Sequence, residues 1–239
     1  MRLSVIESYF FGAPLRGVSC KPFILVSLKR FLHLLTVASL VFSSLAISLF
    51  CFPAADNKII RALSFAEKLL SVFENILFNQ LNIKGQLKTA INYVISEIFT
   101  NITEHSNSKS GWMMIQNYPT KQFLDVCIAD NGIGILGSYQ KAGFTEIASS
   151  KEALNEAING KSTKIHEKTR GYGIKTSRRM LVNGLGGKYF LFSGNAFYLY
   201  TKAEEQITVL KNASWKGTMF ALRIPNKEPK AFNYVNYLE

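Results

Sequence analysis

Residues 95–106 read ISEIFTNITEHS, and within them Glu97, Asn101 and His105 stand four positions apart. Side chains four residues apart lie on one face of an α-helix, so this spacing predicts a carboxylate, an amide and an imidazole that face the same space. Apolar residues fall on the other faces of this helix: Ile91, Val94, Ile95, Ile98, Phe99 and Ile102. The helix can therefore bury one side in a core and present the polar row on the other.

Residues 127–135, CIADNGIGI, form the second half of the pattern. An apolar run ends in Asp130, and Gly132 and Gly134 follow it. A carboxylate at the end of a buried strand, followed by glycines, is typical of a site where the backbone comes close to a ligand.

Two more glycine motifs lie toward the C-terminus: Gly171 and Gly173 in TRGYGIKTS, and Gly217 with Thr218 in KGTMFALRIP. The four motifs, in this order, resemble the ATP-binding domain that DNA gyrase, the heat-shock chaperone ATPase, sensor histidine kinases and the mismatch-repair ATPase share. The resemblance covers roughly residues 84–225.

This resemblance implies that ATP and Mg²⁺ bind along the polar helix row. Asn101 would supply the protein oxygen that holds Mg²⁺, an ion that proteins usually bind through few side chains plus phosphates and water. Glu97, one turn earlier, would be the catalytic general base. His105 would meet phosphate oxygens or the groups around them.

The same resemblance assigns the adenine end of the nucleotide. Asp130 would accept a hydrogen bond from the adenine amino group, and Thr218 would lie near the base in a water-bridged network. Gly132 and Gly134 would let the backbone pass under the base.

The phosphates would be bound at the start of a later helix. The amides of Gly171 and Gly173 precede this helix, and helix N-termini bind anions. Arg170 and Lys175 are further candidates for phosphate contacts.

A second phosphate motif is set aside. Residues 160–163, GKST, end like a P-loop, but Asn155 stands where its first glycine should be and the preceding segment is helix-like. We interpret residues 137–170 as a polar lid with one helical piece, in which Lys161 could still touch a phosphate.

Composition sets the class of protein. The chain has 239 residues, 48% hydrophobic and 18% charged, with a net charge of +12, as expected for one large domain or a domain with an appendage. A basic surface favours an anionic partner such as a nucleotide. No nucleic-acid partner is expected, because no arginine cluster alternates with stacking aromatics. Cys20, Cys51 and Cys127 form no CxxC pair, which indicates a reducing compartment without disulfide or zinc site.

Residues 31–55 contain no Asp, Glu, Lys or Arg. Twenty-five such residues are enough to cross a bilayer. The alternative is a buried helix at about residues 28–40 followed by a buried strand at 46–52. Slightly more basic residues precede the run than follow it, which would place the ATP module outside the cytoplasm if the run spanned a membrane. Both interpretations stay open, with the ATP-binding domain itself expected in the cytoplasm.

The remaining pattern predicts an α+β fold, a two-layer sandwich of helices on one face of a mainly antiparallel sheet. Strands are expected at 111–118, 122–129, 188–193, 197–202, 206–211 and 217–224, and a helix at 172–184. The chain would divide into an N-terminal segment (1–56), a connecting helix (57–83), the ATP-binding domain (84–225) and a peripheral tail (226–239).

The function expected from this sequence is a protein (serine or histidine) kinase-like phosphotransferase in signalling or regulation, or a slow ATPase. The alternative is an ATP-gated interaction module without significant catalysis. A histidine kinase would carry its acceptor histidine on a helix just upstream, but here the only upstream histidine is His33, inside the apolar run. A self-phosphorylating histidine kinase is therefore disfavoured. The sequence is compatible with a homodimer.

Overall fold

The computed structural model describes residues 83–108, 111–163 and 173–238. Its helices and strands are, in chain order, α5 (Gly85–His105), β1 (Gly111–Tyr118), η2 (Pro119–Lys121), β2 (Phe123–Asp130), α6 (Gly134–Lys141), α7 (Ser150–Ile158), α8 (Gly173–Arg179), the π-helical turn η3 (Met180–Gly184), β3 (Lys188–Gly194), β4 (Ala196–Tyr200), β5 (Glu205–Val209), β6 (Trp215–Pro225) and η4 (Tyr234–Tyr237).

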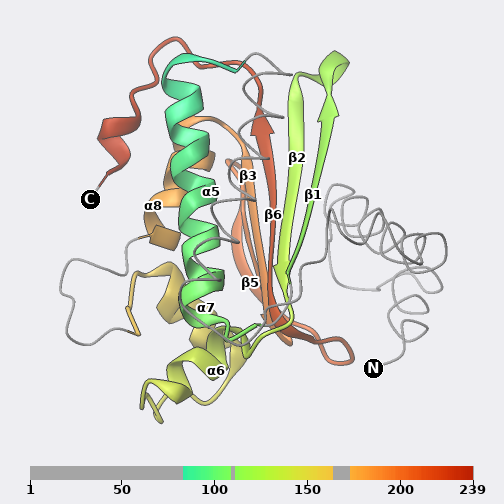
Figure 1. Cartoon of the computed structure of the whole chain (residues 1–239), viewed down its shortest axis with the longest axis vertical. Helices are drawn as coiled ribbons and strands as arrows, with labels where there is room; N and C mark the ends of the chain where they lie inside the picture. The colour runs from blue at the N-terminus through green and yellow to red at the C-terminus, as the bar shows by residue number, and fades with distance from the viewer. Residues whose placement is uncertain (1–82, 109–110, 164–172, 239) are drawn as a thin grey trace.

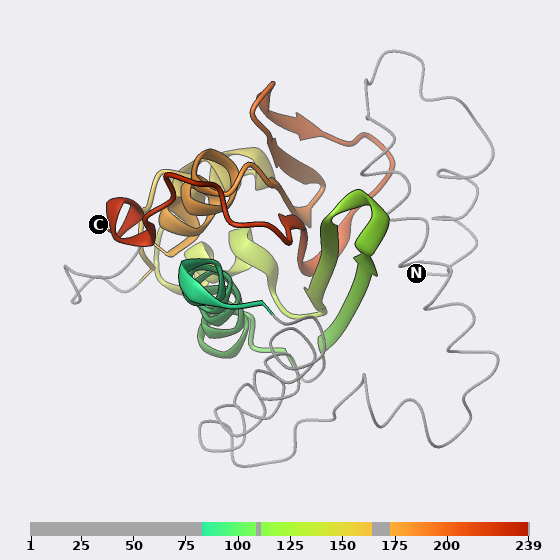
Figure 2. The same ribbon diagram turned by 90° about the horizontal axis from the view of Figure 1, so that it is seen from above.

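The described strands form one sheet in the order β1-β2-β6-β3-β4-β5, and every neighbouring pair is antiparallel. The helices gather on one face of this sheet (Figures 1 and 2). The predicted α+β arrangement is therefore confirmed, and the strand boundaries differ from those expected by only a few residues.

The core lies between α5 and the sheet. The apolar side of α5 is buried as the periodicity predicted, and alternate residues of β2 and β6 meet it: Leu124, Val126, Ile128, Phe220, Leu222 and Ile224. Because this face of α5 is fixed in the core, the opposite polar row is held in place at the end of β2.

The segment after Pro225, expected to be peripheral, packs on the domain instead. Phe232 joins the main core with only 7% of its surface exposed. Glu228 accepts a hydrogen bond from the amide of Leu87 in the first turn of α5, and Gln86 accepts one from the amide of Tyr234. Lys84 offers no side-chain cap to α5, so the tail supplies a partner that the start of the helix lacks.

This packing predicts that the tail contributes to stability. Phe232→Ala is expected to lower the free energy of unfolding by about 3 kcal/mol, because truncating a buried phenylalanine removes its apolar burial and leaves a cavity. Val235→Ala, at a side chain that is 53% exposed in the same tail, is the matched control and should change it little. Urea titration of both variants measures the difference, and equal effects would show that the tail is peripheral after all.

The segment predicted as a loop-rich lid is largely folded. Residues 134–141 and 150–158 form α6 and α7, and a capping box of Ser149 and Glu152 starts α7. Tyr139, Ile147, Ala153 and Ala157 form a second small core between these helices. The helical piece expected within this segment, at 151–158, is confirmed as α7, whereas the helix α6 was not expected. The lid interpretation itself stays a prediction, and residues 164–170 lie outside the described part.

No helix in the described ranges has the length and apolar content to cross a bilayer. The uncharged run at 31–55, like the expected N-terminal segment and connecting helix, lies outside those ranges.

Candidate functional site

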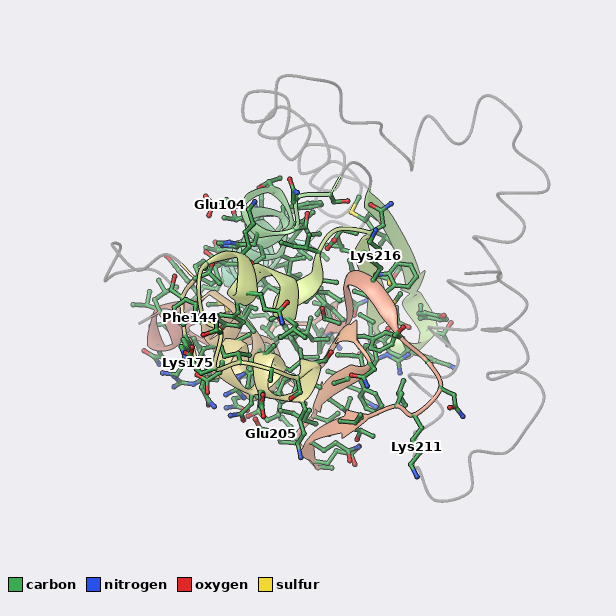
Figure 3. All side chains as sticks on the ribbon, turned by 90° about the horizontal axis from the view of Figure 1, so that it is seen from below. Glu104, Phe144, Lys175, Glu205, Lys211 and Lys216 are labelled. Atoms are coloured by element: carbon green, nitrogen blue, oxygen red, sulfur yellow. The ribbon has the colours of Figure 1, made fainter. Side chains whose placement is uncertain are left out.

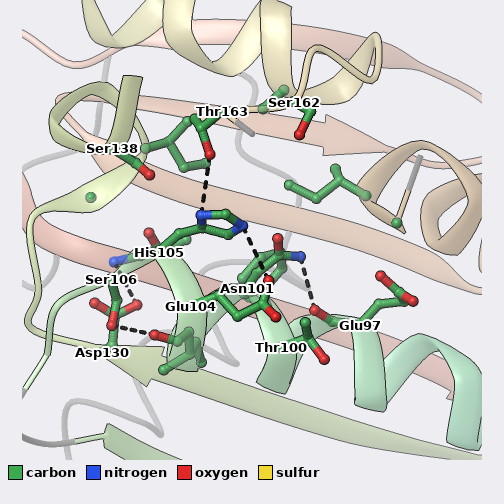
Figure 4. Close-up of a pocket in the computed structure, with 18 of the residues that line it drawn as sticks. Glu97, Thr100, Asn101, Glu104, His105, Ser106, Asp130, Ser138, Ser162 and Thr163 are labelled. Atoms are coloured by element: carbon green, nitrogen blue, oxygen red, sulfur yellow. Dashed lines mark hydrogen bonds and ion pairs between the residues drawn. The ribbon is translucent and has the colours of Figure 1, made fainter. Parts of the chain in front are cut away.

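A pocket of about 390 Å³ opens between the C-terminal half of α5, the end of β2, α6 and the start of α8 (Figure 4). Its size is within the range of small-molecule sites. Its lining comprises Tyr93, Glu97, Thr100, Asn101, Ile102, Glu104, His105, Ser106, Asp130, Gly134, Ile135, Ser138, Tyr139, Ala157, Lys161, Ser162, Thr163, Gly173, Ile174, Thr218 and Phe220.

The polar row of α5 forms one wall of this pocket. Glu97, Asn101 and His105 all line it, as the helical spacing predicted. The side-chain amide nitrogen of Asn101 donates to the carbonyl oxygen of Glu97 at 2.9 Å. The donor end of this amide is therefore occupied within the helix, which leaves its oxygen to the pocket.

Glu97 lies against the first residue of α8. A Cβ on Gly173 would collide with Oε2 of Glu97, so any other residue at this position would displace the carboxylate from its present place. The negative charge of Glu97 also helps to raise the pKa of Tyr93, one turn earlier on α5, although burial is the larger cause. The start of α8 thus closes over the carboxylate.

Asp130 occupies the opposite wall, at the end of β2, and is fully buried. Its Oδ1 accepts a hydrogen bond from the amide of Gly132 at 2.7 Å, and its Oδ2 accepts one from the amide of Thr218 at 3.2 Å. Burial raises the pKa of this carboxyl to about 6, because desolvation outweighs the two amide donors. A carboxylate fixed in this way can accept a further hydrogen bond from a ligand in the pocket.

Tight packing around Asp130 explains the glycines that follow it. A Cβ on Gly132 would collide with the carbonyl oxygen of Ser106, and one on Gly217 would collide with the carbonyl oxygen of Asp130. Gly132 does not line the pocket, whereas Gly134 does, with φ of +70°. The close approach that requires Gly132 is therefore to the protein's own backbone.

His105 meets the chain that follows α7. Its Nδ1 lies 3.2 Å from the hydroxyl of Thr163, and its Nε2 lies 3.8 Å from a carboxylate oxygen of Glu104 (Figure 4). The imidazole therefore connects the last turn of α5 to the last residue described before the gap at 164–172.

The GKST segment is not a P-loop, since helix α7 precedes it rather than a strand. Lys161 does line the pocket, and its carbonyl oxygen accepts a hydrogen bond from Tyr139. Its ammonium group lies 3.1 Å from a carboxylate oxygen of Glu146 and over the ring of Phe144. In this arrangement the charge of Lys161 is paired with an acidic side chain.

Arg178 fixes α8 in position. Its Nη1 donates to the hydroxyl of Tyr198 at 2.7 Å and to Glu205 at 2.8 Å, and its Nε donates to the carbonyl oxygen of Ile158. One guanidinium thus holds the end of α7 and the end of α8 against β4 and β5. This anchoring keeps Gly173 close to Glu97.

Not every residue predicted for the site reaches the pocket. Lys175 does not line it, and in Figure 3 it lies well apart from Glu104, a pocket residue at the end of α5. Arg170 and Gly171 lie outside the described residues.

Tyr93 and Ser193 are among the residues of this region that the sequence interpretation missed. Tyr93 lines the pocket four positions before Glu97, so extending the polar row by one helical turn could have found it. Ser193 accepts a hydrogen bond from the amide of Ile135 and donates one to the carbonyl oxygen of Gly217. Nothing in the sequence around Ser193 indicates this role, because it depends on the pairing of β3 with β6.

The chain was also compared with known proteins. A family model described as "Histidine kinase-, DNA gyrase B-, and HSP90-like ATPase" matches residues 86–228. The matched span includes every residue that lines the pocket. A search of curated proteins finds no match.

Proposed function

Because the chain belongs to the histidine kinase-, DNA gyrase B- and HSP90-like ATPase family, whose domain binds ATP, we propose that it binds Mg-ATP in the pocket between α5 and α8 and transfers the terminal phosphate. The observation that carries this proposal is the pairing, in one pocket, of a buried carboxylate on β2 with a carboxylate and an amide on α5.

Asp130 binds the adenine end. Its two oxygens are already held by the amides of Gly132 and Thr218, so the carboxylate is oriented before the ligand arrives. A buried acceptor of this kind distinguishes the adenine amino group from a carbonyl, since an unpaired buried charge costs more than a lost neutral contact. Thr218 lines the same part of the pocket and assists at the base.

The donor set at the other end fits Mg²⁺. The side-chain oxygen of Asn101 is available because its nitrogen donates to the carbonyl of Glu97, and Mg²⁺ takes few protein oxygens beside phosphates and water. A bound Mg²⁺ would neutralise charge on the phosphates. His105, the last residue of the polar row, and Gly173, at the start of α8, both line the pocket and meet the phosphate oxygens. Arg170, Gly171 and Lys175 remain further candidates for the phosphates.

Glu97 is the general base. Its carboxylate lines the pocket one helical turn from Asn101, where it can accept the proton of an attacking hydroxyl group. That hydroxyl belongs to water in hydrolysis or to a side chain of a partner protein in a kinase reaction. We favour transfer to a partner in signalling or regulation.

Incubation of the purified chain with γ-labelled ATP, Mg²⁺ and cell lysate tests this function. Label on a separate protein supports the kinase, and release as free phosphate supports the ATPase. Stoichiometric ATP binding without any transfer of phosphate identifies an ATP-gated interaction module. A homodimer is one assembly in which such a module would act. Failure of ATP to bind at all would overturn the proposal.

The pKa of Asp130 predicts how ATP binding depends on pH. The ionised carboxylate accepts from adenine, so the affinity is expected to fall as the pH drops below about 6, where Asp130 takes up a proton. Asp130→Asn is the control, because its side chain does not titrate. The protonation of ATP itself affects the wild type and this variant equally. Isothermal titration from pH 5 to 8 measures both, and parallel profiles would contradict the adenine assignment.

The same shift affects stability in a defined direction. A carboxyl whose pKa is raised from 3.8 to about 6 on folding favours the folded state below pH 3.8, and that contribution is lost as the pH rises through about 6. The difference amounts to about 3 kcal/mol, so the ionised Asp130 opposes folding at neutral pH. Keeping a buried charge at this cost is typical of a functional residue.

A further inference from the structure

The sheet has a second face, which points away from α5, α6, α7 and α8 (Figure 1). Four strands contribute apolar side chains to it, and strand pairing makes them neighbours: Phe192 pairs with Phe197 and Met219, and Phe190 pairs with Leu199. We call this the outer sheet face. It comprises Cys127, Ala129, Phe190, Phe192, Phe197, Leu199 and Met219.

These seven side chains are buried, with exposed fractions of 0–7%. None of them belongs to either core that the helices form with the sheet. The rings of Phe190, Phe192 and Phe197 contact one another, with centroids 5.4 and 6.5 Å apart, but contacts within one face cannot remove it from water. The described helices therefore do not account for the burial of the outer sheet face.

The sequences of the strands also indicate that this face is covered. A strand with one solvent-exposed face alternates apolar and polar residues, whereas β3 and β4 contain the continuous apolar runs YFLF and AFYLY. Continuous apolar runs are typical of strands buried on both faces. The sheet is therefore built to be covered on both sides.

Charged residues mark where this apolar face ends. Arg223 on β6 forms two hydrogen bonds with Asp125 on β2, at 2.8 and 2.9 Å, and its guanidinium lies 3.8 Å from the ring centroid of Phe123. These residues are on the same side of the sheet, at the Pro225 end of β6. The apolar part is thus bounded, as expected for a surface that receives one segment.

We propose that residues 31–55 of the same chain cover the outer sheet face as a third layer. This run contains no Asp, Glu, Lys or Arg, so packing it against the phenylalanines buries no charged side chain. The 27 residues from 56 to 82 span about 40 Å as the helix expected at 57–83 and up to about 90 Å when extended, so the run can reach the far side of the sheet from the start of α5.

A membrane span would leave this face without its cover. If residues 31–55 lay in a bilayer, another segment or another molecule would have to cover a contiguous patch containing three phenylalanines, because soluble domains rarely expose such patches. A second copy of the chain could cover the patch, but both the run and the patch would then need separate partners. A cover from within the chain satisfies both.

Photo-crosslinking in the full-length chain tests this. A benzoyl-phenylalanine placed at Phe197 is expected, on irradiation, to crosslink within one chain to peptides from residues 31–55. The same group at Val209, on the edge strand β5 and 46% exposed, is the matched control and should not reach that run. Crosslinked peptides are identified by mass spectrometry, and the chain should keep its monomer mass on a denaturing gel.

Three outcomes would overturn the proposal: a crosslinked dimer, which identifies a second copy as the cover; lipid adducts in the membrane fraction; and crosslinks to another part of the chain. The experiment needs no nucleotide, so its result is independent of the proposed ATP chemistry.

The unsubstituted chain provides a second measurement if the variant fails to fold. Cys127 lies on the outer sheet face and is 3% exposed. Alkylation of this cysteine, followed on its own peptide, should be slow in native protein and should accelerate only on unfolding in denaturant. Alkylation as fast in the native as in the unfolded chain would show that the face is open.

Discussion

Replacement of Glu97 with alanine is expected to lower phosphoryl transfer or hydrolysis by on the order of 10²–10⁴-fold, while ATP still binds. The carboxylate lines the pocket, and the proposed adenine contact is made by Asp130 and not by Glu97. Turnover of γ-labelled ATP and titration with a fluorescent ATP analogue measure the two effects separately.

Two further substitutions distinguish a base from a packing residue. Glu97→Gln keeps the shape that fits against Gly173 but cannot accept a proton, so it should lose turnover like alanine. Asn101→Asp should instead weaken Mg²⁺-dependent binding, because it adds a charge beside the triphosphate. If Glu97→Gln turned over ATP at the wild-type rate, Glu97 would not be the general base.

Asp130→Asn is expected to weaken ATP binding about ten- to hundredfold, which corresponds to the loss of a charge-assisted hydrogen bond worth roughly 1.5–3 kcal/mol. The amides of Gly132 and Thr218 both point at the carboxylate, so an asparagine must turn its NH₂ group toward one of these donors. Binding therefore falls through a lost adenine contact and a disturbed acceptor geometry together.

Asp125→Asn is the matched control for this variant. It removes a buried carboxylate from the same strand, but one that pairs with Arg223 and lies outside the pocket. Thermal denaturation should show a cost for Asp125→Asn, which breaks the pair with Arg223, whereas isothermal titration should show weaker ATP binding for Asp130→Asn alone. If both lose affinity equally, the effect comes from the sheet and the adenine assignment fails.

The polar row of α5 could be predicted from the sequence because helical spacing is a local property. Glu97, Asn101 and His105 follow one another at a fixed interval, and the apolar residues between them determine which side is buried. The order of the four motifs likewise indicated the family and the strand at Asp130. The predicted strands agree with the structure because each is bounded by turn residues close in sequence.

Other predictions depended on contacts between distant segments and were less successful. The tail was expected to be peripheral, but Glu228 contacts the amide of Leu87, 141 positions earlier in the chain. The helix at 151–158 was expected, but α6 was not, because the packing of Tyr139 against Ala153 of α7 that holds it depends on the fold of the whole segment. No local pattern records such pairings.

The sequence by itself determined that this protein has an amphipathic helix with a carboxylate–amide–imidazole row, and a strand that ends in an aspartate followed by glycines. Only the tertiary structure decided what those residues meet. Gly132 is required because a Cβ at this position would collide with the carbonyl oxygen of Ser106, and Gly173 is the residue against which the carboxylate of Glu97 lies. Tertiary packing also raises the pKa of Asp130, because the surrounding sheet and helices bury its carboxyl group away from water. Periodicity is encoded over a few residues, whereas burial and close approach arise only when distant segments pack together.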